Sequence, residues 1–277
     1  MPHAFTDLDC ASLGCKGFLS SNDLADTAII FVHGFTGHPI GTWEDFPGIA
    51  DLETHLPHWS SCDLYFFDYS DVTRSIDDSS DDLEEFLNKI YPHPIQVVEN
   101  ACNLARDRSQ ETAVTYNRLI LVGHSEGGVV IRACIAEVGK RLYRDSAGSA
   151  ILGARLVLFA LALFGFLPTK WFGVVFQFFP LKQLLDIATT WSIAGAELRD
   201  VKTLDQVREI NEKIWKDFPQ FEALTAHVVF GESESVVRKQ RYLQDYKYPA
   251  VRDKDHGSVC KPTSDYQEPL PFVIGED

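Results

Sequence analysis

Residues 118–128, with the sequence Arg-Leu-Ile-Leu-Val-Gly-His-Ser-Glu-Gly-Gly, limit the fold of this chain more than any other segment. An apolar, β-rich run ends in Gly-x-Ser-x-Gly, and a helix-like pattern follows. This order is typical of a nucleophile elbow, in which Ser125 occupies a sharp turn between a strand and a helix. Gly123 and Gly127 have no Cβ atoms, so strand and helix can approach closely there. The segment therefore predicts a serine nucleophile at the end of a strand.

Apolar runs and helical periodicities alternate along the rest of the chain. Strands are predicted over 28–32, 63–67, 119–122, 155–160, 226–230 and 248–251, and helices over 77–91, 95–116 and 126–142. The first 27 residues look polar and irregular apart from one short strand. Strands that alternate with helices indicate an α/β fold with a mostly parallel central sheet and helices on both faces.

The predicted domain organisation is one α/β core, formed by 1–167 and 223–277, with a helical cap inserted at 168–222. The cap falls between two core strands, where an insertion would stand over the active site. Its first half is too aromatic to face water, so it should cover something. Three of its aromatic side chains are expected to line an apolar substrate pocket: Trp171, Phe172 and Phe176.

The most apolar segment runs from Leu156 to Leu181. About 20 consecutive apolar residues would suggest a transmembrane helix. Pro168 and Lys170 fall in its middle, however, and its first part is needed as a strand of the sheet. We therefore favour a core strand followed by an apolar lid over contact with a membrane surface or a true span.

Charge and cysteine content exclude several classes of partner. The formal net charge of −15 argues against nucleic acid and anionic membranes as electrostatic partners. The six cysteines are scattered and form no Cys-x-x-Cys pair, so we expect no metal site and free thiols in a reducing cytoplasm. The first nine residues do not resemble a signal peptide. A small-molecule substrate is the expected partner, and the oligomeric state stays open.

A serine nucleophile needs a base to take its proton and a third group to orient that base. Downstream of Ser125, His227 falls within a predicted strand, whereas His256 falls in a polar loop after the last one. Because the base should lie in a loop at the carboxyl end of the sheet, His256 is the predicted catalytic base.

The acid should follow a strand between the serine and the histidine. No carboxylate follows strand 155–160 before Asp186, whereas the strand at 226–230 is followed by Glu232 and Glu234. A Gly-x-x-acid-x-x-Val turn starting at Gly231 selects Glu234. Glu232 and Asp255 remain as alternatives.

An oxyanion hole requires backbone N–H groups directed at the developing negative charge. One donor is expected from Glu126, directly after the nucleophile, and the other from Phe35, in the loop after the first core strand. His33, in the same loop, is expected to pack and hydrogen-bond rather than react. The Glu126 side chain should point away from the pocket.

Over residues 28–262, these motifs resemble those of the α/β-hydrolase superfamily. The finer resemblance is to lipase-like serine esterases, including the serine-active-site-containing proteins and the inositol-deacylase-like lipases. It rests on three segments: 33–43, 123–128 and 255–262. The resemblance implies an α/β-hydrolase fold with a lid of varied form.

The predicted activity is hydrolysis of carboxylic esters with an apolar acyl or aromatic part through an acyl-enzyme, without a metal or other cofactor. Two alternatives stay open: a lipase, phospholipase or acyltransferase acting on membrane lipids, and a non-catalytic binding or signalling protein on the same fold. Amidase and lactonase chemistry would use the same three residues, so the sequence does not separate them from an esterase.

Overall fold

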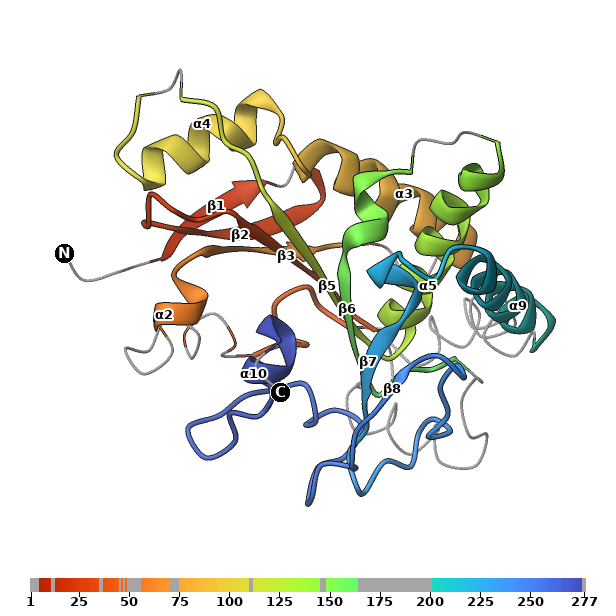
Figure 1. The fold of residues 1–277 in the computed structure, drawn as a ribbon. Helices are drawn as coiled ribbons and strands as arrows, with labels where there is room; N and C mark the ends of the chain where they lie inside the picture. Colours follow the sequence, from red (N-terminus) through yellow and green to blue (C-terminus); the bar gives the residue numbers. More distant parts are fainter. Residues whose placement is uncertain are drawn as a thin grey trace, which may run out of the picture.

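One mixed sheet organises the part of the chain that the computed structural model describes, namely residues 5–10, 13–34, 37–44, 46, 48, 56–69, 75–109, 112–144, 148–163 and 201–275. Its spatial order is β1-β2-β4-β3-β5-β6-β7-β8 (Figure 1). The strands are β1 (Phe5–Cys10), β2 (Cys15–Ser20), β3 (Thr27–Val32), β4 (Cys62–Phe67), β5 (Arg118–His124), β6 (Arg155–Phe159), β7 (Ala226–Val229) and β8 (Tyr246–Lys247). From β4 to β8 all neighbours are parallel, whereas β2 is antiparallel to both β1 and β4. The predicted mostly parallel sheet is thus confirmed.

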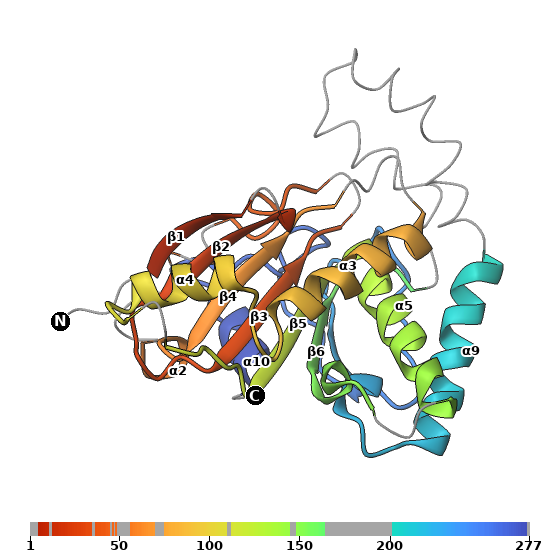
Figure 2. The same cartoon turned by 90° about the horizontal axis from the view of Figure 1, so that it is seen from above.

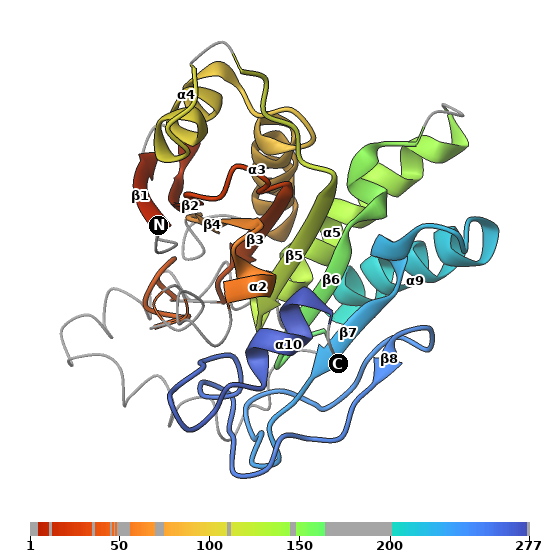
Figure 3. The ribbon, with the colours of Figure 1, turned by 60° about the vertical axis from the view of Figure 1, so that its left-hand side comes forward.

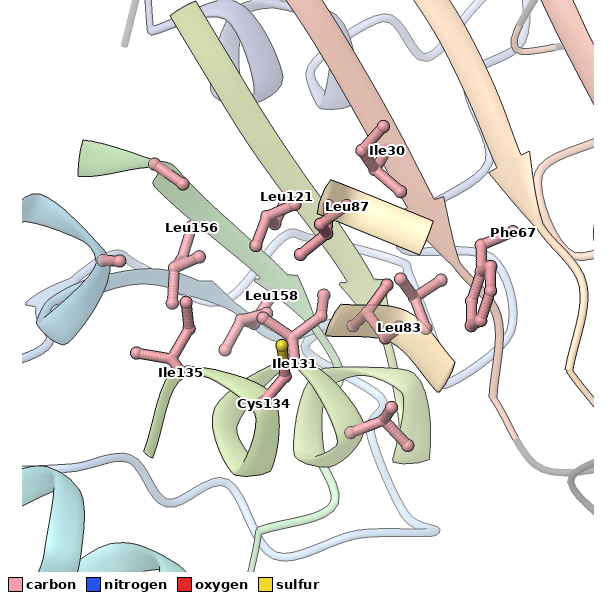
Figure 4. Close-up of a cluster of buried hydrophobic side chains, with 14 of the residues drawn as sticks. Ile30, Phe67, Leu83, Leu87, Leu121, Ile131, Cys134, Ile135, Leu156 and Leu158 are labelled. Carbon is pink, nitrogen blue, oxygen red and sulfur yellow. The ribbon is translucent and has the colours of Figure 1, made fainter. Parts of the chain in front are cut away.

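Both faces of the sheet are buried. All six residues of β3 are inaccessible to solvent or nearly so, which explains why this strand reads as a continuous apolar run. Alternate side chains point to opposite faces: Ile30 enters one hydrophobic core and Phe31 the other. Figure 4 shows Ile30 in the first core with Leu121 of β5 and Leu156 of β6.

Helices cover the two faces unequally (Figures 2 and 3). One face packs against the longer helices α3 (Ile76–Ile90), α4 (Gln96–Ala105), α5 (Glu126–Lys140) and α9 (Val201–Asp217). The short helices α2 (Leu56–Trp59) and α10 (Pro269–Ile274) lie against the other. The connecting 3-10 turns are η2 (Arg141–Tyr143), η3 (Ala150–Gly153) and η4 (Glu222–Leu224). Helices on both faces of a mostly parallel sheet agree with the expected fold class.

The N-terminal region differs from the sequence-based expectation. Instead of one short strand, it forms the antiparallel hairpin β1–β2, which pairs with β4. Leu19 is almost fully buried, while Asp7 and Lys16 on the neighbouring strands form a solvent-exposed ion pair. The polar outer residues hide the alternation that would have indicated two strands.

Two other boundaries also differ. Helix α4 ends at Ala105 rather than near residue 116, because Arg106 leaves helical geometry and Asp107 has a φ of +53°. The last strand is Tyr246–Lys247 rather than 248–251, where only an isolated bridge joins Val251 to Gly231.

The predicted cap is described only in part, because residues 164–200 lie outside the described segments. Its C-terminal part forms α9, which packs against α5 within the main core. Ile214 of α9 approaches Gly139 of α5 so closely that a Cβ there would lie 2.8 Å from the isoleucine side chain. Helix α9 (Val201–Asp217) thus packs beside α5 in the described part of the chain. Among the helices of the described segments, none combines the length and the hydropathy needed to cross a bilayer.

A buried ion pair attaches α5 to the β7 region. Arg132 of α5 pairs with Asp245, and both side chains are fully buried. Asp245 also accepts hydrogen bonds from the backbone N–H groups of Ala226 (2.9 Å) and Tyr242 (3.0 Å). The Arg132 guanidinium carbon lies 4.6 Å from the centroid of the Tyr242 ring. The Asp245 carboxylate is therefore well satisfied, and the ion pair links helix α5 to the β7 region.

Asp245→Ala should lower the free energy of unfolding by about 3–5 kcal/mol, because it leaves the Arg132 charge buried without its partner. Urea or thermal unfolding measures this change. The matched control is Asp23→Ala, since Asp23 is 65% exposed and pairs with Arg108 on the surface; its effect should stay within about 1 kcal/mol. Equal losses in the two variants would contradict the assigned importance of the buried pair.

Candidate active site

Ser125 occupies a strained turn between β5 and α5. Its backbone angles are φ +54° and ψ −119°, a region that non-glycine residues rarely adopt. A Cβ on Gly127 would lie 2.2 Å from the carbonyl oxygens of both Val32 and His33, and one on Gly123 would lie 2.7 Å from the Cα of Gly128. Glycine is therefore required at both positions of the motif for the turn to fit beside β3.

The structure brings three of the residues singled out by the sequence into one hydrogen-bonded chain. The Nε2 atom of His256 lies 3.1 Å from Ser125 Oγ, and its Nδ1 lies 3.0 Å from Glu234 Oε2. The two alternative acids make other contacts. Glu232 accepts a long hydrogen bond from Asp253 N, and Asp255 accepts hydrogen bonds from Ser258. Glu234 is thus the carboxylate that contacts the histidine.

The Glu234 side chain is fully buried, yet it is held in the charged form. Burial alone would raise its pKa. The hydrogen bond and charge of His256, together with the N–H groups of Val237 and Val236, outweigh this effect and lower the pKa below the usual value. Those two N–H groups donate to Glu234 Oε1 at 3.1 and 2.7 Å. The ionised carboxylate can only accept, so His256 Nδ1 carries the proton and Nε2 is left as an acceptor for the serine hydroxyl.

The turn that carries the acid lies directly against the loop that carries the histidine. Ser233 N donates to Lys254 O at 2.9 Å. A Cβ on Gly231 would lie 2.2 Å from that same carbonyl oxygen, so only glycine permits this approach. The glycine that selects Glu234 in the sequence is therefore also the residue that lets the two segments meet.

A second set of contacts joins the histidine loop to residues 37–44. The Cys260 thiol lies 3.6 Å from Thr42 O, and Lys261 Nζ lies 2.6 Å from Glu44 Oε1. Burial raises the pKa of Cys260 to about 12, so it stays a neutral thiol. The histidine loop is therefore held on two sides, by the acid turn and by the segment that follows β3.

The loop after β3 passes close to Ser125. A Cβ on Gly34 would lie 2.8 Å from the Cβ of Ser125, which allows only glycine here. His33 is 1% exposed; its Nδ1 donates to Gly34 O at 2.9 Å, and its ring stacks on Tyr69 at 4.5 Å. The Tyr69 hydroxyl in turn donates to His33 O at 2.9 Å. These are packing and hydrogen-bonding contacts that fix the loop beside Ser125.

Of the two expected oxyanion donors, the structure describes Glu126 but not Phe35. Glu126 is the first residue of α5, directly after Ser125, and its side chain is buried at 4% exposure. Phe35 lies outside the described residues, as do the three cap aromatics Trp171, Phe172 and Phe176. In the described part of the chain, no three His, Cys, Asp or Glu side chains are grouped so as to bind a metal ion.

Sequence reasoning missed one residue of the site, His124. Its Nε2 lies 2.7 Å from the main-chain oxygen of His256, and the two imidazole centroids are 5.0 Å apart. Burial, followed by the nearby charge of His256, lowers the pKa of His124 to about 3. Its position immediately before Ser125 was the available signal, but its partner is a backbone atom far along the chain. His227, the other downstream histidine, lies on β7 and hydrogen-bonds Arg155.

Comparisons with known proteins concern the family and the fold of this chain. Residues 29–260 match the Alpha/beta hydrolase family. Esterase B from Lactobacillus rhamnosis is a similar solved structure, with 11% identity and a TM-score of 0.50 over 99% of this chain and 84% of that one. Carboxylesterase CesB (YbfK) from Bacillus subtilis has 15% identity and a TM-score of 0.49, covering 99% and 93%. Est1E from Butyrivibrio proteoclasticus has 15% identity and a TM-score of 0.46, covering 99% and 95%.

At these identities, the likeness to solved structures concerns the fold alone. Curated protein sequences contain no significant match to this chain. The family match covers most of the sequence and includes the turn at Ser125, the acid turn and the histidine loop up to Cys260. The chain therefore belongs to the alpha/beta hydrolase family.

Proposed function

We propose that this protein is a serine hydrolase that cleaves carboxylic esters with an apolar acyl or aromatic part. The observation that carries the proposal is the hydrogen-bonded chain from Ser125 Oγ through His256 to the buried Glu234. In this proposal Ser125 is the nucleophile, His256 the general base and acid, and Glu234 the group that orients His256. The finer resemblance to lipase-like serine esterases supports an ester as the substrate.

The proposed reaction has two stages. Ser125 Oγ attacks the ester carbonyl carbon while its proton passes to His256 Nε2, and the N–H groups of Glu126 and Phe35 stabilise the oxyanion. The tetrahedral intermediate then expels the alcohol, which takes the proton from His256, and the acyl group stays on Ser125. Water attacks the acyl carbon, again with proton transfer through His256, and releases the acid and the free serine.

The apolar acyl pocket is proposed from composition, since Trp171, Phe172 and Phe176 crowd the segment that follows β6. We also propose a cytoplasmic location. Four buried cysteines of the described segments are free thiols, as expected in a reducing compartment: Cys62, Cys102, Cys134 and Cys260.

A series of p-nitrophenyl esters, run on the wild type and on Ser125→Ala, tests the proposal. Loss of the nucleophile should lower kcat by about 10³- to 10⁶-fold. In the wild type, kcat/KM should rise by up to about 15-fold for every two carbons of the acyl chain until the pocket is full, because each fully buried methylene contributes about 0.8 kcal/mol.

More than a tenth of wild-type activity in Ser125→Ala would exclude this serine as nucleophile. A strict preference for acetyl or charged acyl groups would exclude the apolar pocket. Activation at a lipid interface, or transfer of the acyl group to an added alcohol, would instead identify a lipid-directed lipase or an acyltransferase. Failure of every ester to react would favour a binding protein.

Glu234→Gln should lower kcat by about 10²- to 10⁴-fold, because the amide no longer stabilises the imidazolium that forms on His256. The matched control is Glu232→Gln, a loop carboxylate that makes no contact with His256 among those described. Its kcat should stay within about threefold of the wild type. Steady-state kinetics on one ester compare the two, and the reverse order of effects would assign the acid to Glu232.

The acid limb of the pH profile should report a single proton. The pKa of Glu234 is lowered and that of His124 is about 3, so both keep their charge state down to about pH 5. Neither of these two groups should therefore contribute to the loss of activity as the pH falls towards 5. Above about pH 5, the acid limb of log kcat/KM should have a limiting slope no steeper than one. A slope of two would mean that a second group in the site titrates.

A further inference from the structure

His124 connects the nucleophile strand to the histidine loop. It is the last residue of β5, it is 8% exposed, and its Nε2 lies 2.7 Å from His256 O. A carbonyl oxygen only accepts hydrogen bonds, so Nε2 must carry the proton and donate it. This fixes the neutral tautomer of His124 and attaches the main chain of His256 to β5, the strand that leads to Ser125.

Two ring contacts and the close approach of Gly34 surround the His124 imidazole. The ring of His256 lies 5.0 Å away at 56°, and the Trp43 ring meets it edge-on at 6.3 Å. On the third side, His124 Nδ1 lies 3.3 Å from the position that a Cβ on Gly34 would occupy. The imidazole is thus enclosed by the histidine loop, the loop after β3 and a fully buried tryptophan.

We propose that His124 is a positioning residue for the reaction: by donating from Nε2 to His256 O, it holds the main chain of His256 at the distance from which the ring reaches Ser125. This inference rests on the proposed function, because it gives His256 the role of base. Glu234 controls the rotation of the His256 ring from one end. His124 fixes the backbone from which that ring projects, which Glu234 alone does not do.

The charge state of His124 fits this role. A protonated His124 would place a positive charge beside His256 and oppose the imidazolium that forms there during the reaction. Burial, together with the His256 charge, lowers the pKa of His124 to about 3. His124 is therefore a neutral donor at pH values well above 3.

Two substitutions separate the hydrogen bond from the packing. His124→Gln places an amide N–H the same number of bonds from Cβ as Nε2, so it can still donate to His256 O. His124→Phe keeps a ring of similar size and removes the donor. The matched control is His227→Phe, because His227 is also 8% exposed and hydrogen-bonded but lies on β7, with Arg155 and Tyr248 as partners.

With p-nitrophenyl butyrate, His124→Phe should lower kcat by about 10- to 100-fold with little change in KM, as expected when a base is displaced by up to about 1 Å. The kcat of His124→Gln should be at least about tenfold higher than that of His124→Phe. His227→Phe should keep kcat within about twofold of the wild type. Each variant is assayed well below its own unfolding midpoint. In a His256→Ala background, His124→Phe should cause no further loss, because it acts through His256.

A second measurement does not depend on activity. Proton NMR of the wild type should show a downfield resonance for His256 Nδ1–H, assigned by its loss in His256→Ala. The resonance should persist in His124→Gln and broaden or disappear in His124→Phe.

Any one of three results would overturn the inference. The resonance could be unchanged in His124→Phe, or the kcat of His124→Phe could equal that of His227→Phe. The third is a loss of kcat in His124→Gln as large as that in His124→Phe. If Ser125→Ala is as active as the wild type, or if no ester reacts, the proposed function fails instead. The NMR comparison then still decides whether His124 positions His256.

Discussion

The close approach of three backbone segments at Ser125 is the constraint on which the site depends. The residue has a φ of +54°, and the glycines at 34, 123 and 127 are each too close to other atoms to carry a Cβ. Such strain persists only where the surrounding structure holds it in place. Here the buried strands β3 and β5 and the start of α5 do so, because their apolar side chains fill both cores of the sheet. The packing of the whole sheet thus holds the Ser125 hydroxyl in place at the carboxyl end of β5.

The remaining parts of the site are brought in by loops, and these are held by polar contacts rather than by packing alone. The acid turn contacts the histidine loop through Ser233 and Lys254, and the histidine loop contacts the segment after β3 through Lys261 and Glu44. His124 adds a hydrogen bond from β5, the strand that leads to Ser125. Loops on a rigid sheet are a common place for functional residues. In this protein the loops also contact one another. These contacts keep Ser125, His256 and Glu234 within hydrogen-bond distance.

Local patterns in the sequence predicted the parts of the fold that depend on local interactions. The buried strands are continuous apolar runs, and Glu234 follows from its spacing after Gly231. Features that depend on distant partners were missed. His124 contacts a backbone atom 132 residues away, and Arg132 pairs with Asp245 across 113 residues, so neither partner can be identified from the neighbouring sequence. The β1–β2 hairpin was missed because its outward-facing residues are polar.

The central claim is that Ser125 is a nucleophile activated by His256. The most direct measurement is peptide mapping by mass spectrometry after reaction with a fluorophosphonate, which modifies an activated serine covalently. The account predicts one adduct, on Ser125, which is absent in Ser125→Ala and forms much more slowly in His256→Ala. An unmodified Ser125 in the folded wild type, or an adduct on another residue that persists in Ser125→Ala, would contradict it.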